Sequence, residues 1–295
     1  RDCFIAMGQA DGLSGTYVHL YINGLYWGVY DMHERPSASH VANYYGGDSD
    51  WYDAIKAGAA VDGTMTSWNN LKALVYGASS SSQTDWEAIC AKLDIDNVID
   101  WSIVQCWGYN HDMKSTSNWA AAGGGIFDEP WRYYPWDVER MFEENTVGDP
   151  TNESIFGTGG NFLTGYLDDF AEFRIRFADR VYKHFRNQGA LTAASAQGIF
   201  NKRVTELQDA IIGESARWGD YRRDLYWTVY TKGTRYLYAK EHHWLSDTSY
   251  IDGWLQAAVD MNGYLQAKES NAISFFQGRS PSLYPSIEPP DKATA

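Results

Sequence analysis

The sequence is short of cysteine, of basic residues and of long apolar runs. Its three cysteines include no CxxC pair, and the odd number leaves at least one thiol free; Cys90 and Cys106 lie in apolar helical patterns and are expected to be buried. No run of about 18 apolar residues occurs, so the sequence predicts no membrane-spanning helix. Lys and Arg number 24 against 38 Asp and Glu, and the net charge of −14 disfavours binding to nucleic acid or anionic lipid.

Aromatic side chains, in contrast, are abundant. They make up 16% of the 295 residues, within a hydrophobic share of 44%, and a chain of this length can bury a substantial core as one large domain or two small ones. The sequence begins with Arg1 rather than Met. We interpret it as a piece of a longer chain, in which the lack of a signal segment carries no information.

A β-hairpin is the clearest local pattern. Residues 16–31 read TYVHLYINGLYWGVYD, in which two alternating segments flank Asn23-Gly24, the dipeptide typical of a tight hairpin turn. Pro36 then suits the start of a helix that Gly46-Gly47 would end.

Capping and loop signals divide the next part of the chain. The box Thr84-Asp85-Trp86-Glu87 predicts a helix, and Asp96 predicts the N-cap of a longer helix that ends at Gly108. The polar, Ser-rich residues 62–83 are expected to be a loop.

The C-terminal half looks mostly helical. Apolar residues spaced by three or four predict one helix from Asp168-Asp169 and another capped by Thr192. We expect Arg217 and Trp218 to form a cation–π pair that holds two helices together. The proline-rich residues after Arg279 are expected to be an irregular tail.

The residues most suited to chemistry lie in the loop 110–118 and just after it. Two short strands, 119–122 and 131–136, are expected to form a hairpin that returns Asp137 close to Asp112 and Asn118. Phosphoryl transfer needs such a set: one carboxylate for the attacking hydroxyl, and a second carboxylate with an amide oxygen for Mg²⁺. Lys114 would steady the transferred phosphate.

The same residues allow a structural interpretation. Asp and Asn both favour turns, so spacing alone does not separate a catalytic loop from a structural turn. Asp137 and Glu139 could equally form a solvated strand end. Because Asp137 follows a very aromatic strand, however, we expect its carboxylate to be partly shielded and to need a partner such as a metal.

Several segments resemble the CotH kinase family of secreted bacterial proteins. They are LYINGLYWGVYDMHERP at 20–36, YDAIK at 52–56, WRYYPWDVE at 131–139, FRIRFADRVYKHFRNQGALT at 173–192, ESARWGD at 214–220 and LYPSIEPP at 283–290. The resemblance covers nearly the whole chain. It implies an atypical protein kinase that transfers phosphate from Mg-ATP to Ser or Thr of secreted or surface proteins, and hence an extracellular or cell-surface location.

The resemblance also implies roles for individual residues. Asp112 matches the catalytic Asp, Asn118 and Asp137 match metal ligands, and Trp131 matches an aromatic residue that stacks on adenine. We add Glu139, from the same motif as Asp137, as a candidate metal ligand. Candidate nucleotide-binding residues in the N-terminal part are Glu34, Arg35 and Lys56.

Two departures from the family pattern stand out. Asn118 follows Asp112 by six positions, where the family usually has five, which puts the ligand geometry in question. The strands expected before the hairpin, and a Gly-rich phosphate loop, are not in this sequence; Gly157-Thr-Gly-Gly160 lies in the wrong place to replace one.

We therefore predict an α+β, two-lobed kinase-like fold. Residues 1–56 would be the remainder of a small lobe, 57–280 a mostly helical large lobe, and 281–295 a proline-rich tail. Two other functions stay open. One is a catalytically inactive kinase-like binding or structural module; the other is a glycosidase-like domain using Glu139, Glu143 and Glu144 near Asp137.

Overall fold

The computed structural model describes residues 1–143, 146–149, 155–157, 162–226 and 254–279. The chain divides into two compact units. The first comprises Arg1–Ser14, Glu34–Thr192 and the described part of Lys268–Ala295; the second comprises Gly15–His33 and the described part of Ala193–Ala267. These units do not have the predicted boundary at residue 56, because residues 54–56 pair with residues 59–62. The predicted division into a small and a large lobe remains a prediction.

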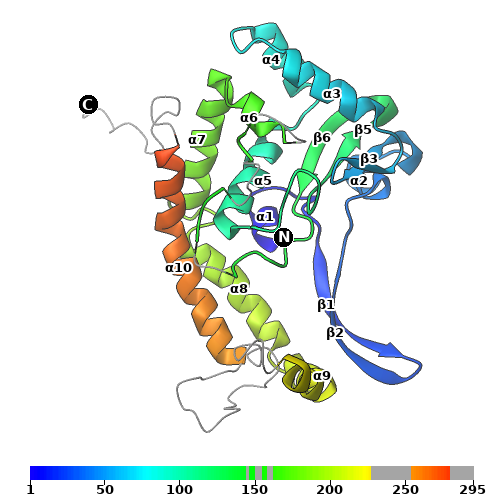
Figure 1. Ribbon diagram of the computed structural model, residues 1–295, viewed down its shortest axis with the longest axis vertical. Helices are drawn as coiled ribbons and strands as arrows, with labels where there is room; N and C mark the ends of the chain where they lie inside the picture. Colours follow the sequence, from blue (N-terminus) through cyan, green and yellow to red (C-terminus); the bar gives the residue numbers. More distant parts are fainter. Residues whose placement is uncertain (144–145, 150–154, 158–161, 227–253, 280–295) are drawn as a thin grey trace. The chain divides into compact units, whose positions relative to one another are not determined.

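A four-stranded antiparallel sheet is the centre of the first unit (Figure 1). Its order is β4 (Ala59–Asp62), β3 (Asp53–Lys56), β5 (Ala120–Gly124) and β6 (Glu129–Tyr134). The β5–β6 hairpin confirms the strand pair predicted before Asp137. A short 3₁₀ helix, η2 (Gly125–Phe127), makes its turn, and another, η1 (Ser49–Trp51), precedes β3.

Helices cover both faces of this sheet. On one face lies α2 (Ala38–Tyr45), the helix predicted after Pro36, and its residues pack with Tyr134 and Ala122. On the other face lie α3 (Thr66–Gly77) and α5 (Ile95–Gly108). Successive residues of β6 point to opposite faces, so Tyr133 faces these two helices while Tyr134 faces α2. There Tyr133 contacts the rings of Trp68, Trp101 and Trp119, with centroids 4.8 to 5.8 Å apart.

The structure corrects three predictions in this region. Residues 66–77 form α3 rather than part of a polar loop, and Trp68, Leu71 and Val75 give it a buried face. Helix α4 (Gln83–Cys90) is capped by Ser82, not by Thr84, because the Ser82 hydroxyl accepts the backbone N–H of Asp85. Likewise Asp94, not Asp96, caps α5 by accepting the N–H of Asn97.

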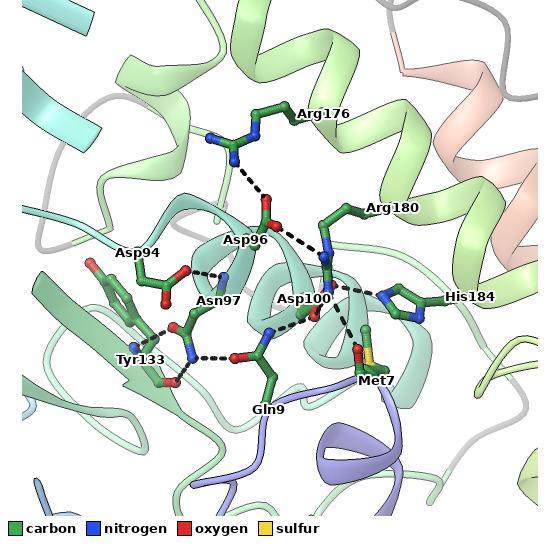
Figure 2. Close-up of polar contacts among 10 residues, drawn as sticks. All are labelled: Met7, Gln9, Asp94, Asp96, Asn97, Asp100, Tyr133, Arg176, Arg180 and His184. Carbon is green, nitrogen blue, oxygen red and sulfur yellow. Dashed lines mark hydrogen bonds and ion pairs between the residues drawn. The ribbon is translucent and has the colours of Figure 1, made fainter. Parts of the chain in front are cut away.

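A polar network runs through the middle of α5 and joins four parts of the first unit (Figure 2). Asp100, which is fully buried, accepts hydrogen bonds from Gln9, just after α1 (Asp2–Ala6), and from Arg180 of α7 (Ala171–Phe185). His184, one turn along α7, lies 2.9 Å from the same carboxylate. Asp96 pairs instead with Arg176 and Arg180, which explains why it is not available as a cap.

The second unit is built on the predicted hairpin. Strands β1 (Gly15–Ile22) and β2 (Leu25–His33) pair through a turn in which Asn23 and Gly24 both have positive φ, 51° and 79°. Helices α8 (Ala193–Leu207), α9 (Ala210–Tyr226) and the start of α10 (Trp254–Gly278) complete the described part of this unit.

Helix α9 is tied to β2 by three side chains. Glu214 accepts the N–H of Val29 at 2.8 Å, and the indole of Trp218 donates to the carbonyl of Trp27 at 2.7 Å. Arg217 lies over the rings of both Trp27 and Trp218. The predicted Arg217–Trp218 pair is therefore present, but it joins a helix to a strand rather than two helices.

The three cysteines are free thiols. Cys106 is fully buried in α5, while Cys3 and Cys90 are partly exposed. Desolvation raises the pKa of the Cys3 thiol to about 11 and also raises the pKa values of Cys90 and Cys106. Burial is confirmed for Cys106 and is only partial for Cys90.

The observed architecture is a mixed α+β one, with antiparallel strands in the N-terminal part and mostly helices toward the C-terminus. Within the described ranges, no helix has the length and apolar character needed to cross a membrane. Residues 281–295, predicted to be a tail, and most of residues 145–161 lie outside the described residues.

Candidate functional site

The loop between α5 and β5 brings two of the predicted residues into contact. The Asn118 side-chain amide donates to the backbone carbonyl and to the carboxylate Oδ2 of Asp112, each at 2.9 Å. Between them, Lys114 and Ser117 exchange two backbone hydrogen bonds and close a tight turn. The six-residue spacing therefore still places the two side chains together, and it leaves Lys114 exposed to solvent.

The predicted second carboxylate follows the end of β6. Asp137 has a φ of 56°, in the left-handed region, and its side chain is exposed. The expectation of a shielded carboxylate is thus wrong, because β6 ends at Tyr134 and Asp137 lies beyond the strand. Glu139, two residues on, is exposed as well.

An arginine that the sequence reasoning missed lies between these segments. The Arg140 guanidinium contacts the ring Nε2 of His111 at 3.0 Å and donates to Glu143 at 2.9 Å. Glu143 is the main cause that raises the pKa of Arg140, and the charges of Asp112 and Glu139 add to the shift. One cation is thus within electrostatic reach of carboxylates from both segments. Its position three residues after Asp137 is the sequence feature that could have identified it.

Two predicted cations lie over the ring of Trp136, the residue before Asp137. The Arg35 guanidinium lies 5.6 Å, and the Lys56 ammonium 4.8 Å, from the ring centroid of Trp136. All three line a small cavity that also includes Pro36, Val61 and Ala120. Because Trp136 directly precedes Asp137, both cations lie beside the segment that carries the second carboxylate. The sequence reasoning did not single out Trp136.

Two other predicted residues lie apart from this group. The carboxylate of Glu34 accepts the N–H of Ser14 at 2.8 Å and the hydroxyl of Tyr44 at 3.0 Å, so its observed contacts are structural. Trp131 is 1% exposed and packs edge-to-face on Trp68 at 4.9 Å. It lies on the α3 side of the sheet, whereas Trp136 packs against the cluster on the α2 side.

The donor atoms present fit Mg²⁺ and the phosphates of a nucleotide. Asn118 uses its amide nitrogen on Asp112, which leaves its oxygen as a potential ligand, and Asp137 and Glu139 offer exposed carboxylates after β6. Among the described residues, no three His, Cys, Asp or Glu side chains gather into a metal cluster. Mg²⁺ does not need one, because it is usually held by one or two carboxylates together with substrate phosphates.

Comparison with known proteins identifies a family for this chain. No curated protein matches the chain. A family model described as CotH kinase protein, however, matches residues 5–256 of the 295, a range that contains every residue of the site built above. Membership of that family implies a kinase-like enzyme and suggests the use of ATP. The chain belongs to the CotH kinase protein family.

Proposed function

We propose that this chain transfers the γ-phosphoryl group of Mg-ATP to serine or threonine hydroxyls of secreted or surface proteins. The observation that carries the proposal is the contact of Asn118 with Asp112, next to the cation Arg140 and within one loop-and-hairpin segment that ends at Asp137. The location and class of the substrate protein rest on the family resemblance alone.

Each residue has a role that its surroundings support. Asp112 is fixed by the Asn118 amide, so its carboxylate is oriented to take the proton of the attacking hydroxyl. Asp137, Glu139 and the Asn118 oxygen would hold the metal, which neutralises charge on the phosphates when bound. Lys114, which is exposed at the tip of the loop, would meet the phosphate being transferred.

Three further cations lie on or next to the segment that carries Asp137. Arg35 and Lys56, both over Trp136, would bind the phosphates that stay on the nucleotide. Arg140 would exchange part of its pairing with Glu143 for the transferred group. The site as proposed leaves out Trp131 and Glu34, since the first is covered by Trp68 and the second is engaged by Ser14 and Tyr44.

The proposal is tested by label transfer from γ-labelled ATP to a Ser-rich acceptor protein in the presence of Mg²⁺. Asp112→Ala and Asp137→Ala should each lower the rate by a factor on the order of 10² to 10⁴. Asp179→Ala, an exposed aspartate of α7, is the matched control and should leave the rate unchanged. Transfer that survives both site substitutions would contradict the assignment.

A binding module without catalysis predicts a different result. The wild-type chain would then transfer no label, and ATP with Mg²⁺ would not raise its melting temperature. A shift that requires both ATP and Mg²⁺, and that Asp137→Ala removes, excludes this alternative.

A further inference from the structure

A second cavity of the first unit is lined in part by Trp131, which the proposed kinase site leaves out, and by no residue of that site. It measures about 730 Å³ and lies where α3 begins, next to η1, η2 and the start of β6. Asp137, in contrast, follows the opposite end of β6. The lining includes the polar residues Asp50, Asp53, Thr64, Thr66, Ser67 and Asn70. A volume of this size is typical of pockets for small ligands.

The walls of this cavity are held in place by hydrogen bonds around Asp53 and Ser67. Asp53, which is 6% exposed, accepts the N–H of Thr64 at 2.7 Å and the hydroxyl of Ser67. The Ser67 oxygen in turn accepts the N–H of Gly125 at 3.3 Å. Gly125 has a φ of 69°, and a β-carbon there would lie 1.9 Å from the carbonyl oxygen of Trp51. The shape is therefore preorganised, which lowers the cost of binding.

The charges of the lining disfavour an anionic ligand. Three carboxylates, those of Asp50, Asp53 and Asp128, line the cavity with a single ammonium group, that of Lys92. Lys92 is already paired with Asp128. A phosphate or carboxylate ligand would therefore meet net negative charge without a cation to receive it. The nucleotide phosphates of the proposed kinase site find their cations elsewhere, at Arg35, Lys56 and Arg140.

The aromatic and polar groups of the lining suit a ligand with one apolar face. Trp51 is 37% exposed, and Phe127 packs against it edge-to-face at 4.7 Å. Asn70 is exposed on α3 and offers an amide donor and acceptor, while Thr64 and Thr66 add hydroxyls. A pyranose ring has the complementary form, with C–H groups on its flat faces and hydroxyls around its edge.

We propose that this cavity binds a neutral hexose unit of an oligosaccharide, with the ring on Trp51 and hydroxyls on Asn70. Of the three carboxylates, that of Asp128 is paired with Lys92 and that of Asp53 is occupied by the hydrogen bonds from Thr64 and Ser67. Asp50 is exposed to solvent, so its charge is screened by water and a neutral ligand is favoured over a basic one. Such a site would attach the chain to a glycan and does not depend on whether it transfers phosphate.

Calorimetric titration of the whole chain tests the proposal. The probes are neutral tetrasaccharides of glucose, mannose, galactose and N-acetylglucosamine, with AMP and trilysine as anionic and cationic comparisons. At least one tetrasaccharide should bind with a Kd of about 1 mM or lower, a binding free energy of roughly −4 kcal/mol. Trp51→Ala and Asn70→Ala should each weaken binding at least tenfold.

Matched variants separate this site from the kinase site and from misfolding. Asn69→Ala, the neighbouring exposed residue outside the lining, should bind sugar like the wild type, and so should Asp112→Asn. Asn70→Ala should keep the wild-type melting temperature and rate of phosphoryl transfer. The proposal fails if no tetrasaccharide binds, if binding is insensitive to both lining variants, or if AMP or trilysine takes this cavity in place of sugar.

Discussion

Asn97 holds the backbone of Tyr133 from both sides. The N–H of Tyr133 donates to the Asn97 side-chain oxygen at 2.7 Å, and the Asn97 amide donates to the Tyr133 carbonyl at 3.2 Å (Figure 2). Asn97 also donates to Gln9, which reaches Asp100. Helix α5, which leads into the Asp112 loop, is thus fixed to β6, which leads into Asp137.

Replacing Asn97 by Ala should therefore destabilise the chain strongly. The substitution leaves the N–H and the carbonyl of Tyr133 without partners in a region where Asn97 is fully buried. We expect a loss of about 2 to 4 kcal/mol in the free energy of unfolding, measured by urea denaturation. Asn69→Ala, on the exposed face of α3, should change it by less than about 0.5 kcal/mol. Equal effects of the two substitutions would show that the Asn97 contacts carry little energy.

The Asp100 carboxylate should make the free energy of unfolding depend on pH in the acid range. Burial by itself would raise the pKa of Asp100, but the hydrogen bonds and charges of His184 and Arg180 outweigh it, and the net pKa lies below the ordinary 3.8. As the pH falls through 3.8, the unfolded carboxyl takes up a proton before the folded one does, so the free energy of unfolding falls. Above that pH the stabilisation is fully present.

Asp100→Asn tests this assignment. At neutral pH the variant should lose about 3 kcal/mol, because Arg180 keeps its charge but loses its buried partner. Between about pH 4 and about pH 2 its stability should fall less steeply than that of the wild type. Urea denaturation at several pH values measures both effects. Parallel curves for the two proteins would mean that Asp100 is not the group that titrates.

Arg35 and Lys56 should affect nucleotide binding more than the chemical step. If they bind phosphates that do not react, Arg35→Ala and Lys56→Ala remove binding that is equal in the ground and transition states. We expect KM for ATP to rise about tenfold for each, with kcat within about a factor of three, since one lost charged contact is worth roughly 1 to 3 kcal/mol. Lys183→Ala, an exposed lysine of α7, is the control. A fall in kcat at constant KM would assign these cations to the transferred group instead.

Substitutions of Arg140 should affect kcat more than KM for ATP. Arg140→Ala should lower kcat about 10- to 100-fold, and Arg140→Lys should restore part of it, because a positive charge remains beside Asp112. Glu143→Gln, which removes the carboxylate paired with Arg140, should not lower kcat. Steady-state kinetics of label transfer distinguishes these results, and a Glu143 variant as impaired as Arg140→Ala would indicate that the ion pair itself is needed.

Local signals made part of the fold predictable from sequence. The hairpin around Asn23-Gly24 followed from the backbone preference of that dipeptide, and the β5–β6 pair followed from two short apolar segments around a glycine turn. Helix α3 was missed although Trp68, Leu71 and Val75 have helical spacing, because serine-rich composition was given more weight. Strand β3 has only four residues and pairs with β5 far along the chain, which no local pattern shows.

The order of the site residues along the chain was predictable, but their burial and the face of the sheet on which they lie were not. Asp112 and Asn118 meet as expected, since a short loop must return close to its start. Trp131 and Trp136 share one motif, but Trp131 packs on Trp68 whereas Trp136, two residues past the end of β6, packs with the cluster on the α2 side. His111 was not a predicted site residue, and Glu143 was one only for the glycosidase alternative, because their contacts with Arg140 depend on how the segment after Asp137 folds back on the loop.

The fully buried thiol of Cys106 can report local opening of α5, because a reagent reaches it only when the helix opens. A maleimide reacts with the thiolate, and desolvation raises the pKa of this thiol, so labelling at neutral pH must wait until α5 opens. Because α5 ends directly before the Asp112 loop, a nucleotide that orders the loop should slow the labelling of Cys106 while Cys90 continues to react. Mass spectrometry can follow both cysteines in one sample, and so can detect nucleotide binding in variants that transfer no phosphate.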